Sequence, residues 1–357
     1  MRPFIHVATA TAWACAAVAG SAQASTINLN PFYVNDQAID APTKAVQLIY
    51  APNTNTLIER NSGSAIATID VGSGQVTKTF STTRYTDISL SPSGNYVFAS
   101  DYGGENIGYG TASTQSYVTR LDLQARTAAT EATPIAGNVE AISDSTFALK
   151  SSDQWVTFTL NAWSGTQQST QLNVSNGYFS GYYASVYYGD FVYDARTQRL
   201  IHGNSGLSSQ ELQAFSVQNN NFVRQEGSGM YGSASGYGGT VALATDGQTL
   251  YYGSLQVDAL NVSHNLLVFP ELIYAANSKY AFGNGAYYDA KTGVLLGKLG
   301  FDTTVYALDP NSDSFWAYDG SSNQFLHFSS AVPEASTFSL MALGLFGLVW
   351  AHRRRQQ

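Results

Sequence analysis

Asp87-Ile-Ser-Leu-Ser-Pro-Ser-Gly-Asn-Tyr-Val-Phe-Ala-Ser100 is the stretch of sequence that decides the fold. An apolar segment ends at Leu90, a polar turn containing Pro92 and Gly94 follows, and a second apolar segment begins at Tyr96. Proline pre-sets the backbone for a tight turn, and glycine adopts positive φ without a steric penalty. A turn of this chemistry between two segments rich in β-favouring residues predicts a β-hairpin.

The same pattern recurs along the chain from about residue 45. Each copy has an apolar segment, a turn rich in Pro, Asp, Asn, Ser or Gly, and a second apolar or aromatic segment. Their spacing brackets the roughly 40 to 45 residues of a four-stranded propeller blade. The seven copies are Tyr50–Leu57, Leu90–Tyr96, Ile142–Phe147, Tyr193–Leu200, Leu243–Leu250, Ala275–Tyr280 and Leu308–Phe315.

A second turn follows within most of these units, so each unit holds three or four strands. We therefore predict an all-β fold, a β-propeller of seven blades, although the irregular spacing is also compatible with six or eight. The last unit stops after Phe325–Phe328, one strand short, while Thr26–Val34 is strand-like and has no unit of its own. We expect the N-terminal segment to close the ring, which would remove an exposed sheet edge. The predicted second turns are Asp70–Val76, Asp122–Arg126, Asn161–Thr166, Ser216–Phe222, Asn261–Leu266 and Asp289–Val294.

Units such as Asp87–Ser100, followed by Thr119-Arg-Leu-Asp-Leu123, resemble blades of the YVTN or quinoprotein-like propeller superfamily. The resemblance covers most of residues 45–328. It implies the architecture and says little about chemistry, because propellers host binding proteins and several classes of enzyme.

The C-terminal segment, residues 331–357, contains a short polar motif, an apolar run from Phe338 to Ala351 and a cluster of arginines. It resembles the PEP-CTERM sorting signal, although Ala335 stands where the family pattern has proline. The resemblance implies an exosortase as processing partner. The motif is Val332, Pro333, Glu334, Ala335, Ser336 and Thr337, and the arginines are Arg353, Arg354 and Arg355.

The apolar run would form a helix of roughly 21 Å, which is short against a hydrocarbon core of about 30 Å. The arginines that follow it predict a cytoplasmic C-terminus and a stop to transfer. We expect a transient anchor in the inner membrane before cleavage. An ordinary single-span tail anchor is the alternative.

The N-terminus predicts export. Arg2 precedes a mostly apolar stretch, and Ala22-Gln-Ala24 before Ser25 is a small-x-small cleavage site, so we assign residues 1–24 to a signal peptide. The protein would thus be exported and reside at the cell surface or outside the cell. A lipoprotein signal at Cys15 is the alternative. Because Cys15 is the one cysteine, its removal would leave neither a disulfide framework nor a thiolate metal site.

The charge balance argues against nucleic acid as a partner. Between residues 25 and 332 the chain has 13 basic and 24 acidic residues, a net charge of −11. Only 12% of the whole chain is charged, so the surface is expected to be mostly neutral and hydrogen-bonding.

Tyrosine supplies the candidate binding residues. The chain has 23 tyrosines, and two glycine-rich stretches, Tyr178–Gly189 and Gly227–Gly239, are predicted loops that carry some of them. A tyrosine can stack on a sugar and hydrogen-bond to its hydroxyls. Packing within and between strands is the competing explanation. The candidates are Tyr182, Tyr183, Tyr187, Tyr188, Tyr231 and Tyr237.

No catalytic or metal motif stands out. The three histidines between residues 25 and 332 fall in different units, and Asp309-Pro-Asn-Ser-Asp313 lacks the glycine and the bidentate glutamate of an EF-hand loop. We expect no cofactor and no metal. The sequence favours an exported binding or structural module of the cell surface or extracellular matrix, with exopolysaccharide as the candidate ligand. A propeller enzyme (polysaccharide lyase, glycosidase or quinoprotein-like oxidoreductase) and a protein-interaction scaffold remain alternatives.

Overall fold

The structure, a computed structural model, describes residues 33–330 except 82–84, 102–115, 136, 152–155, 176–188, 206–209 and 231–239. The predicted signal peptide (1–24) with its cleavage site, and the segment 331–357 with its sorting motif and arginines, lie outside the described residues. The same holds for the six candidate tyrosines.

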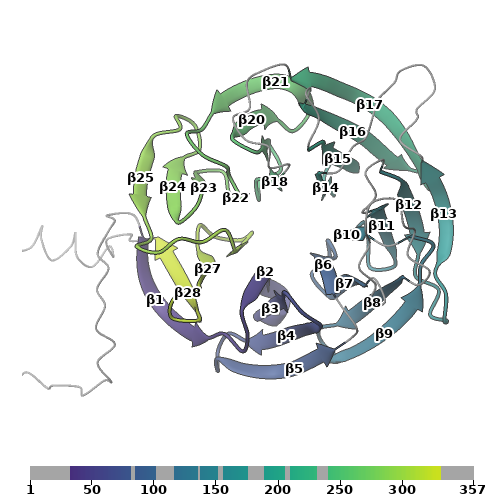
Figure 1. The fold of residues 1–357 in the computed structure, drawn as a ribbon, viewed down its shortest axis with the longest axis horizontal. Coiled ribbons are helices and arrows are strands. Elements are labelled where there is room, and N and C mark those ends of the chain that lie inside the picture. The colour runs from purple at the N-terminus through teal and green to yellow at the C-terminus, as the bar shows by residue number, and fades with distance from the viewer. Residues whose placement is uncertain are drawn as a thin grey trace, which may run out of the picture.

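Seven four-stranded antiparallel sheets surround a central axis, so the predicted seven-bladed β-propeller is confirmed (Figure 1). Strands of a blade follow one another from the axis outward. Blade 1 has β2 (Ala45–Ala51), β3 (Thr56–Asn61), β4 (Ala65–Asp70) and β5 (Gln75–Ser81), with a short 3₁₀ turn, η1 (Pro52–Thr54). Blade 2 has β6 (Tyr85–Leu90), β7 (Tyr96–Asp101), β8 (Tyr117–Asp122) and β9 (Thr127–Ala132). Blade 3 has β10 (Gly137–Ala141), β11 (Thr146–Ser151), β12 (Phe158–Ala162) and β13 (Thr170–Ser175).

The remaining blades continue the ring. Blade 4 has β14 (Asp190–Asp194), β15 (Arg199–Gly203), β16 (Gln210–Gln218) and β17 (Asn221–Met230). Blade 5 has β18 (Val241–Leu243), β19 (Thr249–Tyr252), β20 (Leu255–Asp258) and β21 (Asn261–Val268). Blade 6 has β22 (Ala275–Ala276), β23 (Tyr280–Phe282), β24 (Ala286–Asp289) and β25 (Leu295–Lys298). Blade 7 has β26 (Tyr306–Leu308), β27 (Phe315–Asp319), β28 (Gln324–Ser330) and, as its outer strand, β1 (Tyr33–Asp40).

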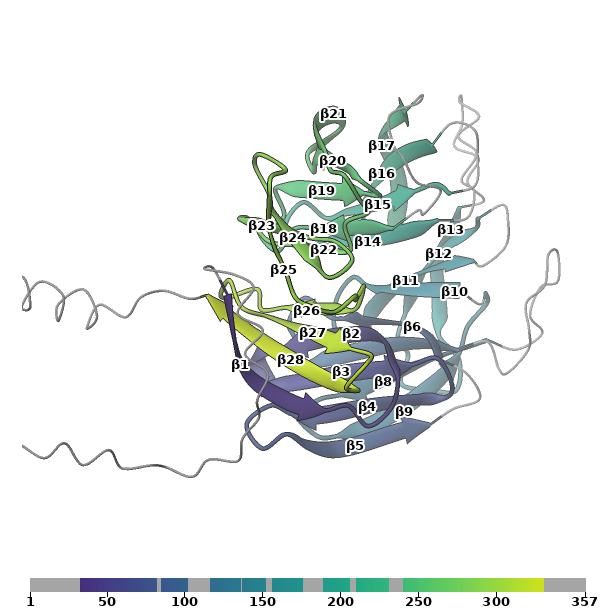
Figure 2. The ribbon, with the colours of Figure 1, turned by 60° about the vertical axis from the view of Figure 1, so that its left-hand side comes forward.

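The N-terminal strand closes the ring, as predicted. β1 pairs antiparallel with β28 from Tyr33 opposite Ser330 to Asp40 opposite Gln324, and the two lie side by side in Figures 1 and 2. The closing strand extends to Asp40, beyond the predicted end at Val34. Tyr33 is buried at this seam, where its ring contacts three other aromatic rings.

The predicted turns lie where expected, with one exception. All seven first turns connect the first and second strands of their blades, and Gly94 and Gly247 adopt the positive φ that their turns require. Five of the six second turns connect third and fourth strands. The predicted turn at Asn261–Leu266 is wrong, because this segment lies within β21. The Asp258 carboxylate makes the turn by accepting the Leu260 N–H, while Asn261 caps Ser263 inside a strand with shifted register.

The hydrophobic core is divided into seven clusters, one at each junction between neighbouring blades. The cluster between blades 3 and 4 contains Phe158, Phe191 and Phe215, for example, and that between blades 6 and 7 contains Phe282 and Phe315. Each blade therefore buries its sheet faces against the two neighbouring blades. Packing of this kind requires no cysteine.

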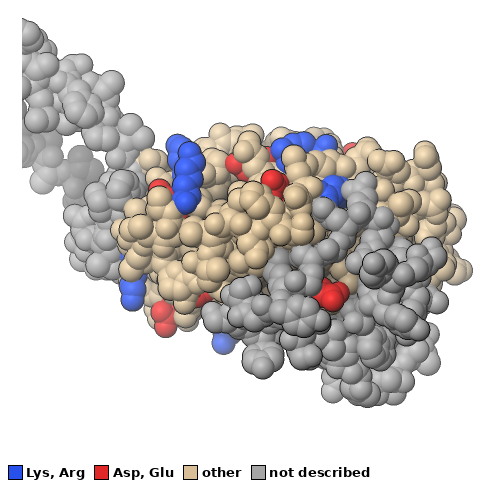
Figure 3. Space-filling view, turned by 90° about the horizontal axis from the view of Figure 1, so that it is seen from above, with Lys and Arg blue, Asp and Glu red and all other residues tan. Residues whose placement is uncertain are grey.

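The described surface carries few charges. On the side of the ring seen in Figure 3, lysine, arginine, aspartate and glutamate are scattered among uncharged residues and form no large patch. Within the described ranges, no helix is long and apolar enough to cross a membrane.

Candidate functional site

The inner strands of the propeller surround a cavity of about 510 Å³. Its lining comes from the beginnings of β6, β10, β14 and β18, from β2, and from residues at the end of β3 and beyond the end of β15. These strands lie around the centre of the ring in Figure 1. We call this space the axial cavity, and its polar lining residues are Gln47, Arg60, Thr86, Asp87, Asn138, Glu140, Asp190, Ser205 and Thr240.

Polar side chains on the inner strands connect each blade to the next. Asp87 Oδ2 in blade 2 accepts the Val139 N–H of blade 3 at 3.0 Å. Asp190 Oδ2 in blade 4 accepts the Val241 N–H of blade 5 at 3.3 Å. An inner strand has no sheet partner on its axial side, so a carboxylate there satisfies backbone donors that would otherwise be buried alone.

Two further junctions follow the same rule. Gln47 of blade 1 donates to the Ile88 carbonyl oxygen at 2.9 Å and accepts the Ile88 N–H at 3.2 Å. Glu140 of blade 3 interacts with the backbone of Tyr193 in blade 4, and its Oε2 accepts the Ser89 hydroxyl at 2.9 Å. Four consecutive junctions are thus bridged at the axis, which gives these acidic residues a structural role.

The carboxyl groups at the cavity have raised pKa values. Burial raises the pKa of Asp190 to about 6, with Asp87 adding to the effect and Lys150 opposing it. Burial, and then the charge of Asp87, raise the pKa of Glu140 well above its usual value. Burial also raises the pKa of Asp87, whereas the charge of Arg60 lowers it in part. Burial and the neighbouring carboxylate thus both favour the protonated form of Glu140.

Two cations balance this cluster. Lys150 on β11 is only 4% exposed, and burial lowers its pKa while Asp190 and Asp87 oppose the change. Arg60 Nε donates to Gln47 Oε1 at 2.8 Å. The axial cavity thus offers hydrogen-bond donors, acceptors and carboxyl groups with raised pKa values, which suits a neutral polar ligand.

Packing explains several tyrosines that were not among the six candidates. Tyr251, Tyr252, Tyr287 and Tyr288 are buried in the junctions between blades, so packing explains them. The six candidates lie outside the described residues. Gly189 and Thr240, which directly follow the segments 176–188 and 231–239, both line the axial cavity.

The acidic residues of the cavity were missed as site residues. Each is an isolated acidic residue on the inner strand of its unit, as in Asp87-Ile88, Glu140-Ala141 and Asp190-Phe191. The recurrence of an acidic residue on the inner strand of three consecutive units was the pattern in the sequence that could have indicated this site. Which faces of the strands meet at the axis becomes visible only in the folded ring.

The described histidines do not join this cluster. His202 of blade 4 is buried against Phe158 of blade 3, His264 lies on β21, and His327 lies at the seam of blade 7. Across the part of the chain that the structure describes, no group of three His, Cys, Asp or Glu side chains could hold a metal ion. Asp309, the start of the rejected calcium loop, accepts the N–H of Asn311 and the hydroxyl of Ser312 in its own turn.

Comparison with solved structures supports the architecture. The crystal structure of the β-propeller domain of Myceliophteria thermophila Cps50 (Swd1) is similar, with a TM-score of 0.63 and 14% sequence identity, over 84% of this chain and 99% of that chain. In all, 1142 chains of solved structures match, so the fold is too common to indicate a function. No curated protein sequence matches the chain. The YVTN or quinoprotein-like subtype stays a prediction.

The tail matches a defined sorting signal. The chain is a seven-bladed β-propeller that carries the PEP-CTERM protein-sorting motif at residues 331–355. This motif implies an exported protein that an exosortase processes and sorts toward the cell surface.

Proposed function

We propose that this exported propeller is a binding or structural module of the cell surface or extracellular matrix, and that its ligand is an exopolysaccharide. The observation that carries the proposal is the axial cavity, which combines amides, hydroxyls and a carboxyl group with a strongly raised pKa. Such a lining suits the hydroxyl groups of a neutral glycan. A glycan is also the class of polymer that an exported matrix protein meets.

The aromatic part of the proposed site comes from the sequence. Gly189 and Thr240 line the cavity, and the tyrosine-rich segments 176–188 and 231–239 immediately precede them in the chain. We infer that Tyr182, Tyr183, Tyr187, Tyr188, Tyr231 and Tyr237 contribute stacking contacts to sugar rings of the ligand. The inner membrane would hold the chain transiently through residues 338–351 before exosortase cleavage.

Binding of the native exopolysaccharide to the full chain tests the proposal. The chain is kept in a detergent without a sugar headgroup, so that the detergent does not compete for the site. Asn138→Ala should weaken binding, since Asn138 lines the cavity, whereas Asn35→Ala on the outer strand β1 should not. Replacing the paired tyrosines, Tyr182 and Tyr183, by alanine should weaken binding more than replacing them by phenylalanine. Absence of binding by the unmodified chain would exclude exopolysaccharide as the ligand.

A glycan-cleaving enzyme is the second candidate. The specific observation is Glu140, a carboxyl group with a raised pKa in a cavity that also contains Asp87 and Asp190. A carboxyl group with a raised pKa beside a second carboxyl group is an arrangement that general acid catalysis uses. Release of reducing ends from the native polysaccharide, lost in Glu140→Gln, would favour the enzyme over the binding module.

A further inference from the structure

A second cavity, of about 300 Å³, lies between blades 1 and 2. Its walls are β4 and β5 of blade 1 and the turn between β8 and β9 of blade 2, which neighbour each other in Figures 1 and 2. We call it the blade 1–2 cleft. Thr56 lines this cleft and Arg60 lines the axial cavity, and the two residues lie at opposite ends of β3. The two cavities are therefore separate.

The junction between blades 4 and 5 has the same backbone arrangement. Arg199 and Thr56 are equivalent, because each begins the second strand of its blade and pairs with the last residue of the first strand. Ala259 and Leu123 are equivalent on the facing blades. The Ala259 N–H donates to the Gln248 carbonyl oxygen at 3.0 Å, and the Leu123 N–H donates to the Asn95 carbonyl oxygen at 3.1 Å.

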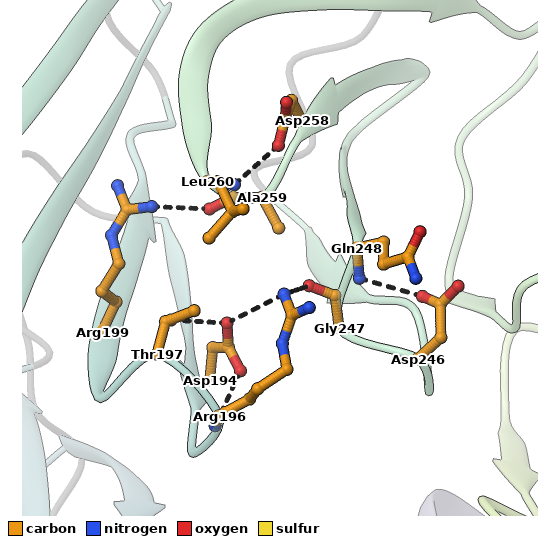
Figure 4. Close-up of polar contacts among 10 residues, drawn as sticks. All are labelled: Asp194, Arg196, Thr197, Arg199, Asp246, Gly247, Gln248, Asp258, Ala259 and Leu260. Atoms are coloured by element: carbon orange, nitrogen blue, oxygen red, sulfur yellow. Dashed lines mark hydrogen bonds and ion pairs between the residues drawn. The ribbon is translucent and has the colours of Figure 1, made fainter.

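The side chains at these equivalent positions differ in reach. Arg199 is 6% exposed, and its Nη1 crosses the junction to donate to the Ala259 carbonyl oxygen at 2.8 Å (Figure 4). Arg196 adds a second crossing bond to the Gly247 carbonyl oxygen. Thr56 is short and donates to Thr54 of its own blade at 3.0 Å. An arginine thus fills one junction, and a threonine leaves the other hollow.

The two carboxylates of the cleft are held in place with one oxygen each to spare. Asp122 Oδ1 accepts the Ala125 N–H at 2.8 Å. Asp70 Oδ1 accepts the Ser73 N–H and hydroxyl at 2.8 and 2.7 Å, and these bonds lower the pKa of Asp70. Among the described residues, neither Oδ2 atom accepts a hydrogen bond. Both oxygens are available acceptors on side chains that their turns already orient.

Three other polar groups of the cleft have no hydrogen-bond partner among the described residues, whereas Thr68 and Thr77 bond to each other. Thr54 Oγ1 is buried without a hydrogen-bond partner, which is uncommon for a buried hydroxyl. The Arg126 guanidinium and the Gln124 amide form no hydrogen bond with any described residue, and both line the cleft. Phe80 and Leu123 add apolar surface, at 8% and 7% exposure.

This set of groups defines a class of ligand. Two carboxylate oxygens and a buried hydroxyl can bind a partner rich in hydroxyl groups, while one guanidinium can donate to the oxygens of that partner. The two carboxylates disfavour an anion. The volume is at the lower end of the range for ligand pockets, so it suits one sugar ring more than a longer chain.

We propose that the blade 1–2 cleft binds a single neutral sugar residue through Asp70, Asp122 and Arg126, with Phe80 against the ring. The site is distinct from the axial cavity and extends the proposed function, since a propeller with two glycan sites can connect two polymer strands. The connection of two strands rests on the proposed function of the axial cavity, whereas sugar binding in the cleft can be tested without it.

Calorimetric titration of the full chain with methyl glucoside, methyl galactoside and methyl mannoside tests the proposal, in a detergent without a sugar headgroup. At least one glycoside should bind. Thr56→Arg copies the residue of the filled junction, so it should fold normally and weaken binding by about tenfold or more. Asp122→Asn keeps the acceptor for Ala125 and should weaken binding less. Thr170→Arg, on the exposed face of β13, is the matched control and should bind like the unmodified chain.

Failure of all three glycosides to bind, or equal binding by Thr56→Arg, would overturn the proposal. Asn138→Ala separates the two sites, because it changes the axial cavity and should leave glycoside binding in the cleft intact. Polysaccharide binding that survives Thr56→Arg but not Asn138→Ala would support the axial site alone. Circular dichroism and thermal melting of each variant exclude misfolding as the cause.

Discussion

His327 Nδ1 lies 2.6 Å from Asp36 Oδ1, across the seam at which the first and last strands of the propeller meet. The Trp316 ring covers His327 at a centroid distance of 4.7 Å. The two partners come from β28 and from the bulge in β1, so 291 residues separate them in sequence. A side-chain bond therefore reinforces the backbone ladder that holds the ring closed.

Asp36→Ala should lower the free energy of unfolding by about 1 kcal/mol, because it removes the partner of His327 from a half-exposed site. Urea unfolding of the purified chain measures the change. Asn35→Ala, next to it on an exposed part of β1, is the control and should have a smaller effect. Equal effects of the two variants would argue against a contribution from the pair.

Tyr33→Ala should destabilise the ring far more, by about 3 to 5 kcal/mol, which is typical of a buried aromatic residue replaced by alanine. Tyr33 is 6% exposed, its hydroxyl donates to the Asp313 carbonyl oxygen at 3.0 Å, and its ring contacts Tyr280, Tyr287 and Phe315. Val34→Ala is the matched control because Val34 is 50% exposed. Thermal melting and limited proteolysis near residue 40 would reveal release of β1.

The axial carboxyl groups should make stability depend on pH. A folded-state pKa above the unfolded one means that the folded chain keeps a proton that the unfolded chain has lost, so stability falls as pH rises through that interval. For Asp190 the interval runs from 3.8 to about 6. The corresponding loss is roughly 3 kcal/mol.

Glu140→Gln provides the specific test of this pH dependence. Glutamine resembles the protonated glutamate, so the variant should match the unmodified chain near pH 4 and become the more stable of the two as pH rises. Denaturant unfolding at several pH values between 4 and 8 measures the difference. A constant difference over that range would mean that Glu140 has no raised pKa.

Processing at the tail should depend on the sorting motif. Glu334→Ala should cause the full-length chain to accumulate, because the exosortase signal is lost, whereas Ala335→Pro restores the family pattern and should raise the processed fraction. Immunoblots of membrane and released fractions measure both. Thr337→Ser serves as a conservative control within the motif. Unchanged processing of Glu334→Ala would show that the exosortase does not recognise this residue.

Local turn chemistry made the fold predictable, whereas contact between distant segments decided the site. Leu90–Tyr96 and its six counterparts mark their turns by residues that cap or bend the backbone locally. The predicted turn at Asn261–Leu266 was wrong because the Asn261 side chain caps Ser263 within the strand β21. Asp87 and Val139 lie 52 residues apart, so nothing local indicates that they meet at the axis. The hollow at Thr56 likewise depends on which side chain the next blade brings against it.

The seam joins the first and the last strand of the propeller to be synthesised. β1 is synthesised first and its partner β28 last, so the first strand has no sheet to join until the final blade exists. The sorting signal begins at residue 331, directly after β28 ends at Ser330. The ring can therefore close only after the strand that directly precedes the sorting motif has been made.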